Sequence, residues 1–275
     1  LPLTVNGHLM PGKFELPGDV SSQFVSGLLF ALPLLKGDSE IIITSPLESA
    51  SYVDMTLNCL AKYGVKVENV DGAHRHYLVP GKQRFKAQDS KVEGDWSQAA
   101  FWTVGGALGA GITASGVDFA SLQGDKAVVE IMQRMGADIA KTDDSVTVNS
   151  GATQATVIDA SDCPDIIPVL TVLAAVSEGT TKIINAGRLR IKECDRLAAM
   201  TSELNKMGAA ITEEPEGLTI SGKPEGLRGG VEADAWNDHR IAMSLAIAAQ
   251  CCAEPITLTG AGSVSKSYPD FWQDY

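Results

Sequence analysis

The chain has 275 residues, of which 44% are hydrophobic and 20% charged, and its formal net charge is -12. This composition is that of a folded protein long enough for one large or two ordinary domains, and it excludes a mainly disordered chain. The acidic balance argues against a nucleic-acid binder, which needs a broad basic surface, but a local cluster of cations can still hold a small anion.

Four stretches along the chain share one pattern and predict a repeated unit. In each, a short polar or acidic segment caps an apolar helix, and a break such as Lys36-Gly37 separates that helix from a β-rich run such as Ile41-Ile42-Ile43. The four stretches are "PGDVSSQFVSGLLFALPLLKGDSEIII" from Pro17, "EGDWSQAAFWTVGGALGAGITASGV" from Glu93, "DASDCPDIIPVLTVLAAVSEGTTKIIN" from Asp159 and "EADAWNDHRIAMSLAIAAQCCAEPITLTG" from Glu232.

A second shared element lies between these stretches. It is an amphipathic helix that runs into a glycine and a polar hairpin, and it begins at Tyr52, Ala127 and Asp195. Each repeat is therefore expected to contain a helix, a strand, a helix and two strands, packed with its sister repeats around shared cores. The capped helices are expected to lie in interiors, including Leu28, Leu29, Phe30 and Leu32 of the first. Their N-termini would converge, so that the polar caps are where function should be sought.

The segment "GRLRIKECDRLAAM" at residues 187–200 places four cations and two acids where a helix begins. Apolar residues recur at helical spacing after it, so the first turn is expected near Lys192 to Arg196. Helix polarity disfavours cations at this end. The segment indicates either a solvated helix with a Glu193–Arg196 pair or a site where the cations surround an anionic ligand.

The caps of the other helices leave similar alternatives. Ser21 and Ser22 suit either plain capping or an anion cradle, and Asp165 suits an ordinary helix entry. Arg240 lies in the first turn of an apolar helix, so a buried cation there needs an anionic partner. His239 is expected to support the site, and Lys266 would by itself be an exposed lysine.

Several classes of site are not indicated. The five cysteines show neither disulfide nor metal-ligand spacing, so we expect no metal site and a reducing cytoplasm. No apolar run approaches the roughly 18 residues that span a membrane. The run "GGALGAG" at residues 105–111 lacks the GK[ST] ending of a phosphate loop.

Taken together, the motifs resemble the 5-enolpyruvylshikimate-3-phosphate synthase family of enolpyruvyl transferases. The matching stretches, in the family's order, are "GDVSSQF", "SASYVDMTL", "EGDWSQAAF", "GDKAVVEIMQRMGA", "CPDIIP", "LRIKECDR", "WNDHRIAM" and "SKSYPDFW". The resemblance implies a mixed α/β (α+β) fold of repeated βαβαββ units in a two-lobed, inside-out α/β barrel. Residues 1–91 would be the remaining part of the first lobe, with one repeat unit, and residues 92–275 the second lobe, with three.

The activity implied by the resemblance is transfer of the carboxyvinyl group of phosphoenolpyruvate to the 5-hydroxyl of shikimate 3-phosphate, with release of phosphate. It implies no cofactor and no metal. Asp165 would accept the proton of the substrate hydroxyl, and Glu193 would donate a proton to the methylene carbon of phosphoenolpyruvate. The residues implied for shikimate 3-phosphate are Ser21, Ser22, Gln23, Ser49, Asp165, Arg188 and Lys192. Those implied for phosphoenolpyruvate are Gln23, Arg196, Arg240 and Lys266.

Two departures from the family pattern lead to further expectations. Arg188 stands where some members have Asn, so its contact to the shikimate ring would differ. The family's early segment has no counterpart before Leu1, so the chain looks like the later two-thirds of such an enzyme. We expect little or no turnover from the chain alone and a monomeric full-length enzyme. The partial first lobe would expose apolar faces, which predicts self-association or local disorder there.

Three other readings remain open. The chain could belong to the related transferase acting on UDP-N-acetylglucosamine, or it could be a non-catalytic fragment that binds phosphate ligands. It could also be a scaffold domain without a small-molecule site, in which case the charged residues above would be coincidental surface charge.

Overall fold

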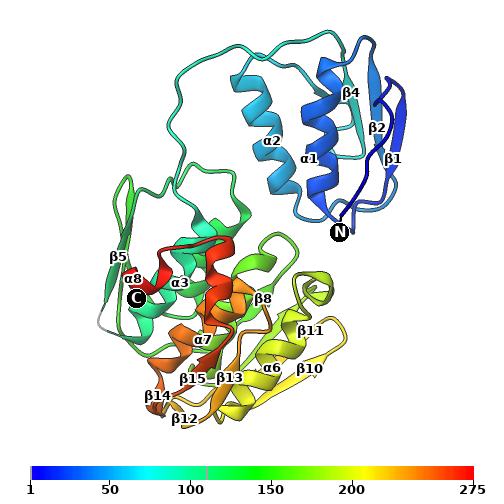
Figure 1. Cartoon of the computed structure of the whole chain (residues 1–275). Helices are drawn as coiled ribbons and strands as arrows, with labels where there is room; N and C mark the ends of the chain where they lie inside the picture. The colour runs from blue at the N-terminus through cyan, green and yellow to red at the C-terminus, as the bar shows by residue number, and fades with distance from the viewer. Residues whose placement is uncertain (1, 110) are drawn as a thin grey trace. The chain divides into compact units, whose positions relative to one another are not determined.

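The computed structural model of the chain describes residues 2–109 and 111–275 and divides into two units (Figure 1). The first unit extends to Lys91 and includes the short segment Leu122–Gly124, and the second comprises Val92–Ser121 and Asp125–Tyr275. Each unit has its own hydrophobic core. No helix of the described residues has both the length and the apolar character needed to cross a membrane.

The first unit is one βαβαββ repeat. Strand β2 pairs with β1 in parallel and with β4 in antiparallel orientation, and β3 pairs with β4, which gives the order β1-β2-β4-β3. Its elements are β1 (Lys13–Leu16), α1 (Ser22–Ala31), the short 3-10 helix η1 (Leu32–Leu34), β2 (Ser39–Ile43), α2 (Ala50–Lys62), β3 (Glu68–Asn69) and β4 (His76–Val79).

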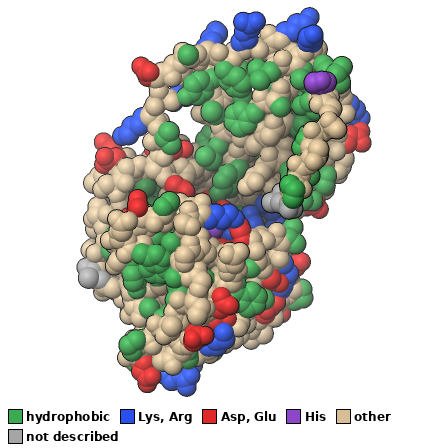
Figure 2. Space-filling model, viewed as in Figure 1, with side chains coloured by type: hydrophobic (Ala, Val, Ile, Leu, Met, Phe, Trp, Pro, Cys, Tyr) green, Lys and Arg blue, Asp and Glu red, His purple; other side chains and the backbone are tan. Residues whose placement is uncertain are grey.

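Helix α1 is less buried than its apolar sequence predicts. Leu29 and Leu32 lie in the core, but Phe30 is 42% exposed and Phe24 59% exposed, while Leu28 is only partly buried. The expectation that Leu28 and Phe30 are interior is therefore wrong. Helix α1 packs through one side against its own unit. In that unit the opposite side stays open to solvent, and Figure 2 shows the hydrophobic side chains that gather over α1 and α2.

The second unit contains the same order of elements once more, in its middle repeat. Its middle repeat has parallel β8 and β9, with β11 antiparallel to β9 and β10 antiparallel to β11. The sheet order β10-β11-β9-β8 is therefore that of the first unit, read from the other edge. The elements of this repeat are β8 (Val157–Asp159), η3 (Pro164–Ile166), α5 (Ile167–Ala175), β9 (Thr180–Ile184), η4 (Gly187–Ile191), α6 (Arg196–Lys206), β10 (Ile211–Glu214) and β11 (Gly217–Ser221).

The flanking repeats of this unit are shorter. The preceding one forms the sheet β5-β7-β6, and the last forms two parallel pairs, β12 with β14 and β13 with β15. Their elements are α3 (Trp96–Leu108), β5 (Ile112–Ser115), η2 (Gly124–Lys126), α4 (Ala127–Arg134), β6 (Asp138–Lys141), β7 (Ser145–Asn149), β12 (Leu227–Gly229), β13 (Glu232–Asp234), α7 (His239–Ala249), β14 (Cys252–Glu254), β15 (Thr257–Thr259), η5 (Ala261–Lys266) and α8 (Phe271–Asp274).

The centre of the second unit is a group of three packed helices, α3, α5 and α7. Every residue of α5 is buried, and so is every residue of α7 from His239 to Ala248. Because such helices have no exposed polar face, they must be covered on several sides, and neighbouring helices and strands provide this cover. The expected interior position of the capped helices is therefore confirmed in this unit, and the mixed α/β fold class is confirmed for the chain.

Candidate active site

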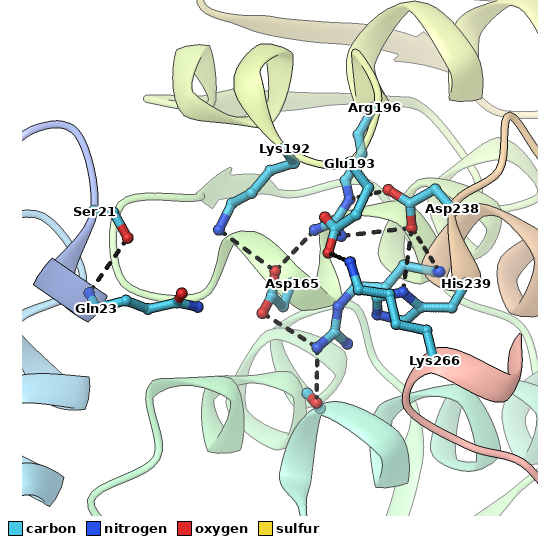
Figure 3. Close-up of polar contacts among 11 residues, drawn as sticks. Ser21, Gln23, Asp165, Lys192, Glu193, Arg196, Asp238, His239 and Lys266 are labelled. Carbon is cyan, nitrogen blue, oxygen red and sulfur yellow. Dashed lines mark hydrogen bonds and ion pairs between the residues drawn. The ribbon is translucent and has the colours of Figure 1, made fainter. Parts of the chain in front are cut away.

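The guanidinium of Arg196 is the centre of the polar contacts in the second unit (Figure 3). Its Nη1 donates to Asp165 Oδ1 at 2.8 Å, its Nη2 to Glu193 Oε2 at 2.7 Å, and its Nε to Asp238 Oδ2 at 2.8 Å. The side chain is 1% exposed. A planar cation with several fixed donors is suited to join carboxylates from different segments in this way.

Asp165 lies in η3 at the start of α5, and it binds cations rather than capping the helix. Besides Arg196, its Oδ2 lies 3.2 Å from Arg240 Nη2 and its Oδ1 3.8 Å from Lys192 Nζ. Burial opposes ionisation of this carboxyl, but Arg240, Arg196 and Lys192 outweigh it and hold the pKa of Asp165 well below its ordinary value. Asp165 is therefore ionised at neutral pH.

Glu193 is held between Arg196 and Lys266. Its Oε1 accepts a hydrogen bond from Lys266 Nζ, and its Oε2 accepts the bond from Arg196. Burial raises the pKa of Glu193, but Lys266 and Arg196 have the larger combined effect and lower it to about 2. Lys266 is the last residue of η5, and its side chain is partly exposed. Its partner in the folded chain is Glu193, 73 residues away in sequence.

Arg240 enters the same place from the N-terminus of α7. Its Nη2 donates to Asp165 Oδ2 and to Ser97 Oγ, at 3.2 and 3.1 Å. Its Nη1 is buried and has no hydrogen-bond partner among the described residues. The anionic partner that the sequence predicted for Arg240 is thus Asp165, and Nη1 of Arg240 remains able to donate to a further acceptor.

Two further cations lie near these residues: Arg188 is part of η4, and Lys192 directly follows it. Burial lowers the pKa of Lys192, and the nearby Arg188 adds to this, while Asp165 acts in the opposite direction. Arg188 is therefore close enough to repel Lys192. We define the carboxylate–cation cluster by six side chains: Asp165, Lys192, Glu193, Arg196, Arg240 and Lys266.

Arg190, from the same motif, takes no part in the cluster. Its Nη1 donates to Asp195 Oδ2 at 2.9 Å and to Glu213 Oε1 at 2.6 Å, and its other nitrogens reach the carbonyl oxygens of Pro215 and Glu214. These contacts attach the turn of the β10–β11 hairpin to the start of α6. One of the four cations that raised the question of an anionic ligand is therefore structural.

The helix of this motif also begins later than expected. Asp195 is its N-cap, with Oδ1 accepting from the backbone N–H of Ala198 at 3.1 Å, and Arg196 is its first residue. Lys192 and Glu193 precede the helix, so the expectation of a first turn near Lys192 to Arg196 is wrong in its start. The positive end of the helix dipole lies at Arg196, which is unfavourable for a cation. Asp195 and the three carboxylates bound to Arg196 compensate for this repulsion.

The residues expected to bind shikimate 3-phosphate in the first unit lie at one end of that unit. Ser21 caps α1 by accepting from Gln23 N at 3.3 Å, and Ser49 precedes α2 in the left-handed region at a φ of 52°. Ser26 and Thr56, one turn or more into the two helices, are joined by a hydrogen bond of 2.7 Å. Because the backbone of Glu48 also donates to the carbonyl of Gly18, the two helix N-termini lie at the same end.

Ser22 is buried beneath this end, whereas Gln23 is exposed. The first-unit set of Ser21, Ser22, Gln23 and Ser49 and the carboxylate–cation cluster thus belong to different units, and each set is gathered within its own unit.

Two contributors were not among the expected site residues. Asp238 is fully buried, caps α7 through its bond from Arg240 N, and binds Arg196. Ser97, in the first turn of α3, meets Arg240. Both lie at helix starts equivalent to that of Asp165 in the repeat, and this equivalence is the signal that could have found them. His239 lies next to Asp238, and burial followed by the charge of Arg240 lowers its pKa.

The arrangement favours binding of a multiply charged anion. Two ionised carboxylates are surrounded by four cationic side chains, and helices α3, α5, α6 and α7 all direct their N-termini toward them. An anionic ligand that binds Arg196 or Lys266 draws these cations away from Asp165 and Glu193, whereas Arg240 Nη1 can donate to a ligand without giving up a carboxylate. Ligand binding and the protonation of Asp165 and Glu193 are therefore linked.

Comparison with protein families gives a match over the whole chain. The family model of EPSP synthase (3-phosphoshikimate 1-carboxyvinyltransferase) matches residues 1–275. The 3-phosphoshikimate 1-carboxyvinyltransferases of Clostridium kluyveri and Clostridium novyi are 54% and 52% identical to the chain over 275 residues. All of this chain is covered, but it spans 64% and 62% of the length of those relatives.

Solved structures give the same result for the fold. EPSP synthase from Acinetobacter baumannii superposes with a TM-score of 0.81 at 28% sequence identity, covering 96% of this chain and 62% of that one. The enolpyruvyl transferase NikO from Streptomyces tendae superposes with a TM-score of 0.76 at 19% identity, covering 98% of this chain and 64% of that one, and at this identity it bears on the fold alone.

Proposed function

The chain belongs to the EPSP synthase (3-phosphoshikimate 1-carboxyvinyltransferase) family, and on this premise we propose that the protein transfers the enolpyruvyl group of phosphoenolpyruvate to the 5-hydroxyl of shikimate 3-phosphate. Phosphate leaves in the reaction, which belongs to the shikimate pathway of aromatic amino-acid biosynthesis. The observation that carries the proposal is the carboxylate–cation cluster. In it Arg196 binds both Asp165 and Glu193, Arg240 binds Asp165 and Lys266 binds Glu193, and an anionic substrate would bind the same cations.

Phosphoenolpyruvate carries a phosphate and a carboxylate, and Arg196, Arg240 and Lys266 are the side chains proposed to hold them. The unpartnered Nη1 of Arg240 supports this assignment because it is a buried donor that needs an acceptor. Gln23 completes the proposed set from the first unit. Guanidinium groups suit both anions because they can donate two parallel hydrogen bonds.

Shikimate 3-phosphate is proposed to bind to Ser21, Ser22, Gln23 and Ser49 of the first unit and to Asp165, Arg188 and Lys192 of the second. The grouping of the serines at the N-terminal end of α1 and α2 supports this, since helix N-termini favour phosphate. Lys192 supports it as well, because among the described residues its ion pair with Asp165 is long, at 3.8 Å, and leaves donors for a ligand.

The two carboxylates are proposed to divide the proton transfers. Asp165 would accept the proton of the 5-hydroxyl as it attacks C2 of phosphoenolpyruvate, and Glu193 would deliver a proton to the methylene carbon. In the elimination that follows, a proton leaves the methyl carbon and the C2–O bond to phosphate breaks. The enolpyruvyl ether and inorganic phosphate are the products.

Glu193 can donate a proton only after its pKa has risen from about 2. The two cations that lower it are Lys266 and Arg196, and both are proposed ligands of phosphoenolpyruvate. When they turn to the substrate, Glu193 loses its stabilising partners and its pKa rises toward neutrality. Asp165 becomes a stronger base for the same reason, so substrate binding would itself activate both groups.

The shikimate substrate is favoured over UDP-N-acetylglucosamine because the relatives that match the whole chain are named for the shikimate reaction. If the chain were a non-catalytic binder of phosphate ligands, it would bind them but catalyse no reaction, and Glu193 would not be needed as a proton donor.

The test is a titration of the chain with shikimate 3-phosphate, followed by NMR of the backbone amides, with shikimate and inorganic phosphate as controls. We expect saturable shifts at Lys192 and Arg188 with shikimate 3-phosphate and none with shikimate. Equal responses to shikimate 3-phosphate and inorganic phosphate would contradict the proposal, since they would indicate a general phosphate site. In the full-length enzyme, Glu193→Gln should retain binding and lose turnover, and unchanged turnover would also contradict it.

We also propose that the protein works in the cytoplasm and that the full-length enzyme is monomeric. The five cysteines support the first point, since all are free thiols in the structure, as is usual in a reducing compartment.

A further inference from the structure

The turn that carries Asp238 and Arg240 into the carboxylate–cation cluster has an unusual backbone. Trp236 and Asn237 both lie in the left-handed region, with φ angles of 52° and 53°. Asn tolerates this region, but a bulky residue such as Trp rarely adopts it. Contacts around the turn must therefore hold it in place.

The contacts come from a buried acid that has no other assigned role. Glu203, on α6, is 1% exposed. Its Oε1 accepts from the indole Nε1 of Trp236 at 3.0 Å, and its Oε2 accepts from the backbone N–H of Asp234 at 3.1 Å. One carboxylate thus binds both ends of the Asp234–Trp236 segment, which Asn237 separates from Asp238.

Both carboxylate oxygens of Glu203 accept hydrogen bonds, and the carboxylate stays ionised. Lys206 Nζ donates to it at 2.7 Å and Ser202 Oγ at 3.1 Å. Burial opposes ionisation, but the hydrogen bonds from Lys206, Trp236, the backbone of Asp234 and Ser202 together keep the pKa of Glu203 below its ordinary value. An ionised acceptor makes stronger hydrogen bonds than a neutral one, which suits a group that must hold a strained turn.

The same helix also holds the far side of the turn. Arg196 lies seven residues before Glu203, on the same face of α6 and about 10 Å away along the helix axis. Arg196 binds Asp238, and Glu203 binds Asp234 and Trp236. The turn is therefore attached to helix α6 at two points, Arg196 and Glu203. Because α6 is rigid, the fixed distance between these two side chains determines the geometry of the turn.

Asp238 passes this geometry on to both arginines of the site. Its Oδ2 accepts from Arg196 Nε, and its Oδ1 accepts from Arg240 N and so sets the start of α7. A change in the turn would move Asp238 and would alter the directions of both guanidinium groups together.

We propose that Glu203 is a positioning residue of the candidate active site, which fixes the Trp236–Asn237 turn so that Asp238 aligns Arg196 and Arg240 for one anion. Glu203 touches no substrate, and its effect reaches the site through Trp236 and Asp238. The part of the inference that concerns anion affinity rests on the proposed function, whereas the part that concerns Arg196 and Asp238 does not.

The test compares Glu203→Gln and Trp236→Phe with a control, Ser202→Ala, in the 275-residue chain. Glu203→Gln replaces one acceptor oxygen by an amide, and Trp236→Phe removes only the indole donor to the same carboxylate. Ser202→Ala removes a hydrogen bond to Glu203 but leaves both contacts to the turn. Each variant is characterised by its melting temperature, by hydrogen exchange of the Arg196 Nε–H in NMR spectra, and by its dissociation constant for phosphoenolpyruvate.

We expect the Arg196 Nε–H to exchange at least about tenfold faster in both turn variants than in the parent and in Ser202→Ala. Affinity for phosphoenolpyruvate should fall about tenfold in the same two variants. Lower melting temperatures with unchanged exchange in both variants would overturn the inference, because Glu203 would then be merely structural. If one variant fails to fold, the other decides by the same criterion. Faster exchange in a protein whose parent form binds no phosphoenolpyruvate would support the positioning role and contradict the proposed function.

Discussion

Arg196 and Asp238 form a buried ion pair, with Nε and Oδ2 2.8 Å apart and side-chain exposures of 1% and 0%. The two residues come from the starts of different helices, α6 and α7, and are 42 residues apart in sequence. Their pairing is what allows a guanidinium to be buried at a helix N-terminus. It also fixes the geometry in which Arg196 meets Asp165 and Glu193.

Asp238→Ala should strongly destabilise the second unit, by about 3–5 kcal/mol, because it leaves a buried guanidinium with fewer partners and removes the cap of α7. The measurement is urea unfolding followed by circular dichroism. Asp195→Ala is a suitable control, since Asp195 also caps a helix but is partly exposed, and it should cost about 1 kcal/mol. Equal losses in the two variants would mean that capping alone explains the role of Asp238.

Stability should fall in acid through Glu193 and Asp165. Both have a lower pKa in the folded chain than in the unfolded one, where a Glu titrates near 4.5 and an Asp near 3.8. Their contribution is therefore fully present above about pH 4.5 and is lost as the pH falls toward about 2, the folded pKa of Glu193. Melting temperatures between pH 7 and pH 2 would measure this, and Glu193→Gln should show a smaller decrease than the parent.

The pKa of Glu193 should rise when phosphoenolpyruvate binds, because Lys266 and Arg196 then turn to the ligand. The carboxyl carbon of Glu193 can be titrated by NMR with and without the ligand. Lys266→Met should raise the pKa of Glu193 even without ligand, since it removes the hydrogen bond that lowers it most. A pKa that stays near 2 in the complex would argue against Glu193 as the proton donor.

Arg240 and Arg190 should differ in what they contribute. Arg240→Lys loses the planar donors directed at Asp165 and at a ligand, so affinity for phosphoenolpyruvate should fall about tenfold or more. Arg190→Lys should lower the melting temperature but leave that affinity within about twofold, because Arg190 contacts the β10–β11 hairpin. Isothermal titration calorimetry of both variants provides the comparison, and a similar loss in both would contradict the division of roles.

The exposed apolar side of α1 should cause self-association of the chain. Phe24 and Phe30 present large hydrophobic surfaces to solvent in the first unit. Phe24→Gln combined with Phe30→Gln should shift sedimentation toward the monomer and leave the melting temperature almost unchanged. Val25→Gln, on the buried side of the same helix, should instead destabilise the unit. Monomeric behaviour of the parent at high concentration would show the expectation to be wrong.

The sequence by itself determined the repeated units, their helices and strands, and the family. It predicted the strand at Ile41-Ile42-Ile43, which is part of β2, and it placed polar caps before the apolar helices. These features depend on hydrogen bonds and periodicities within a few residues, so they can be read from neighbouring positions.

Only the tertiary structure decided which charged residues meet. Arg190 and Arg196 stand in one motif, yet one contacts a hairpin turn and the other joins three carboxylates. The roles of Asp238, Ser97 and Glu203, and the open side of α1, depended on the same level of structure. The physical reason is that these contacts link residues tens of positions apart, and their charges find partners only after the hydrophobic cores have packed the helices together.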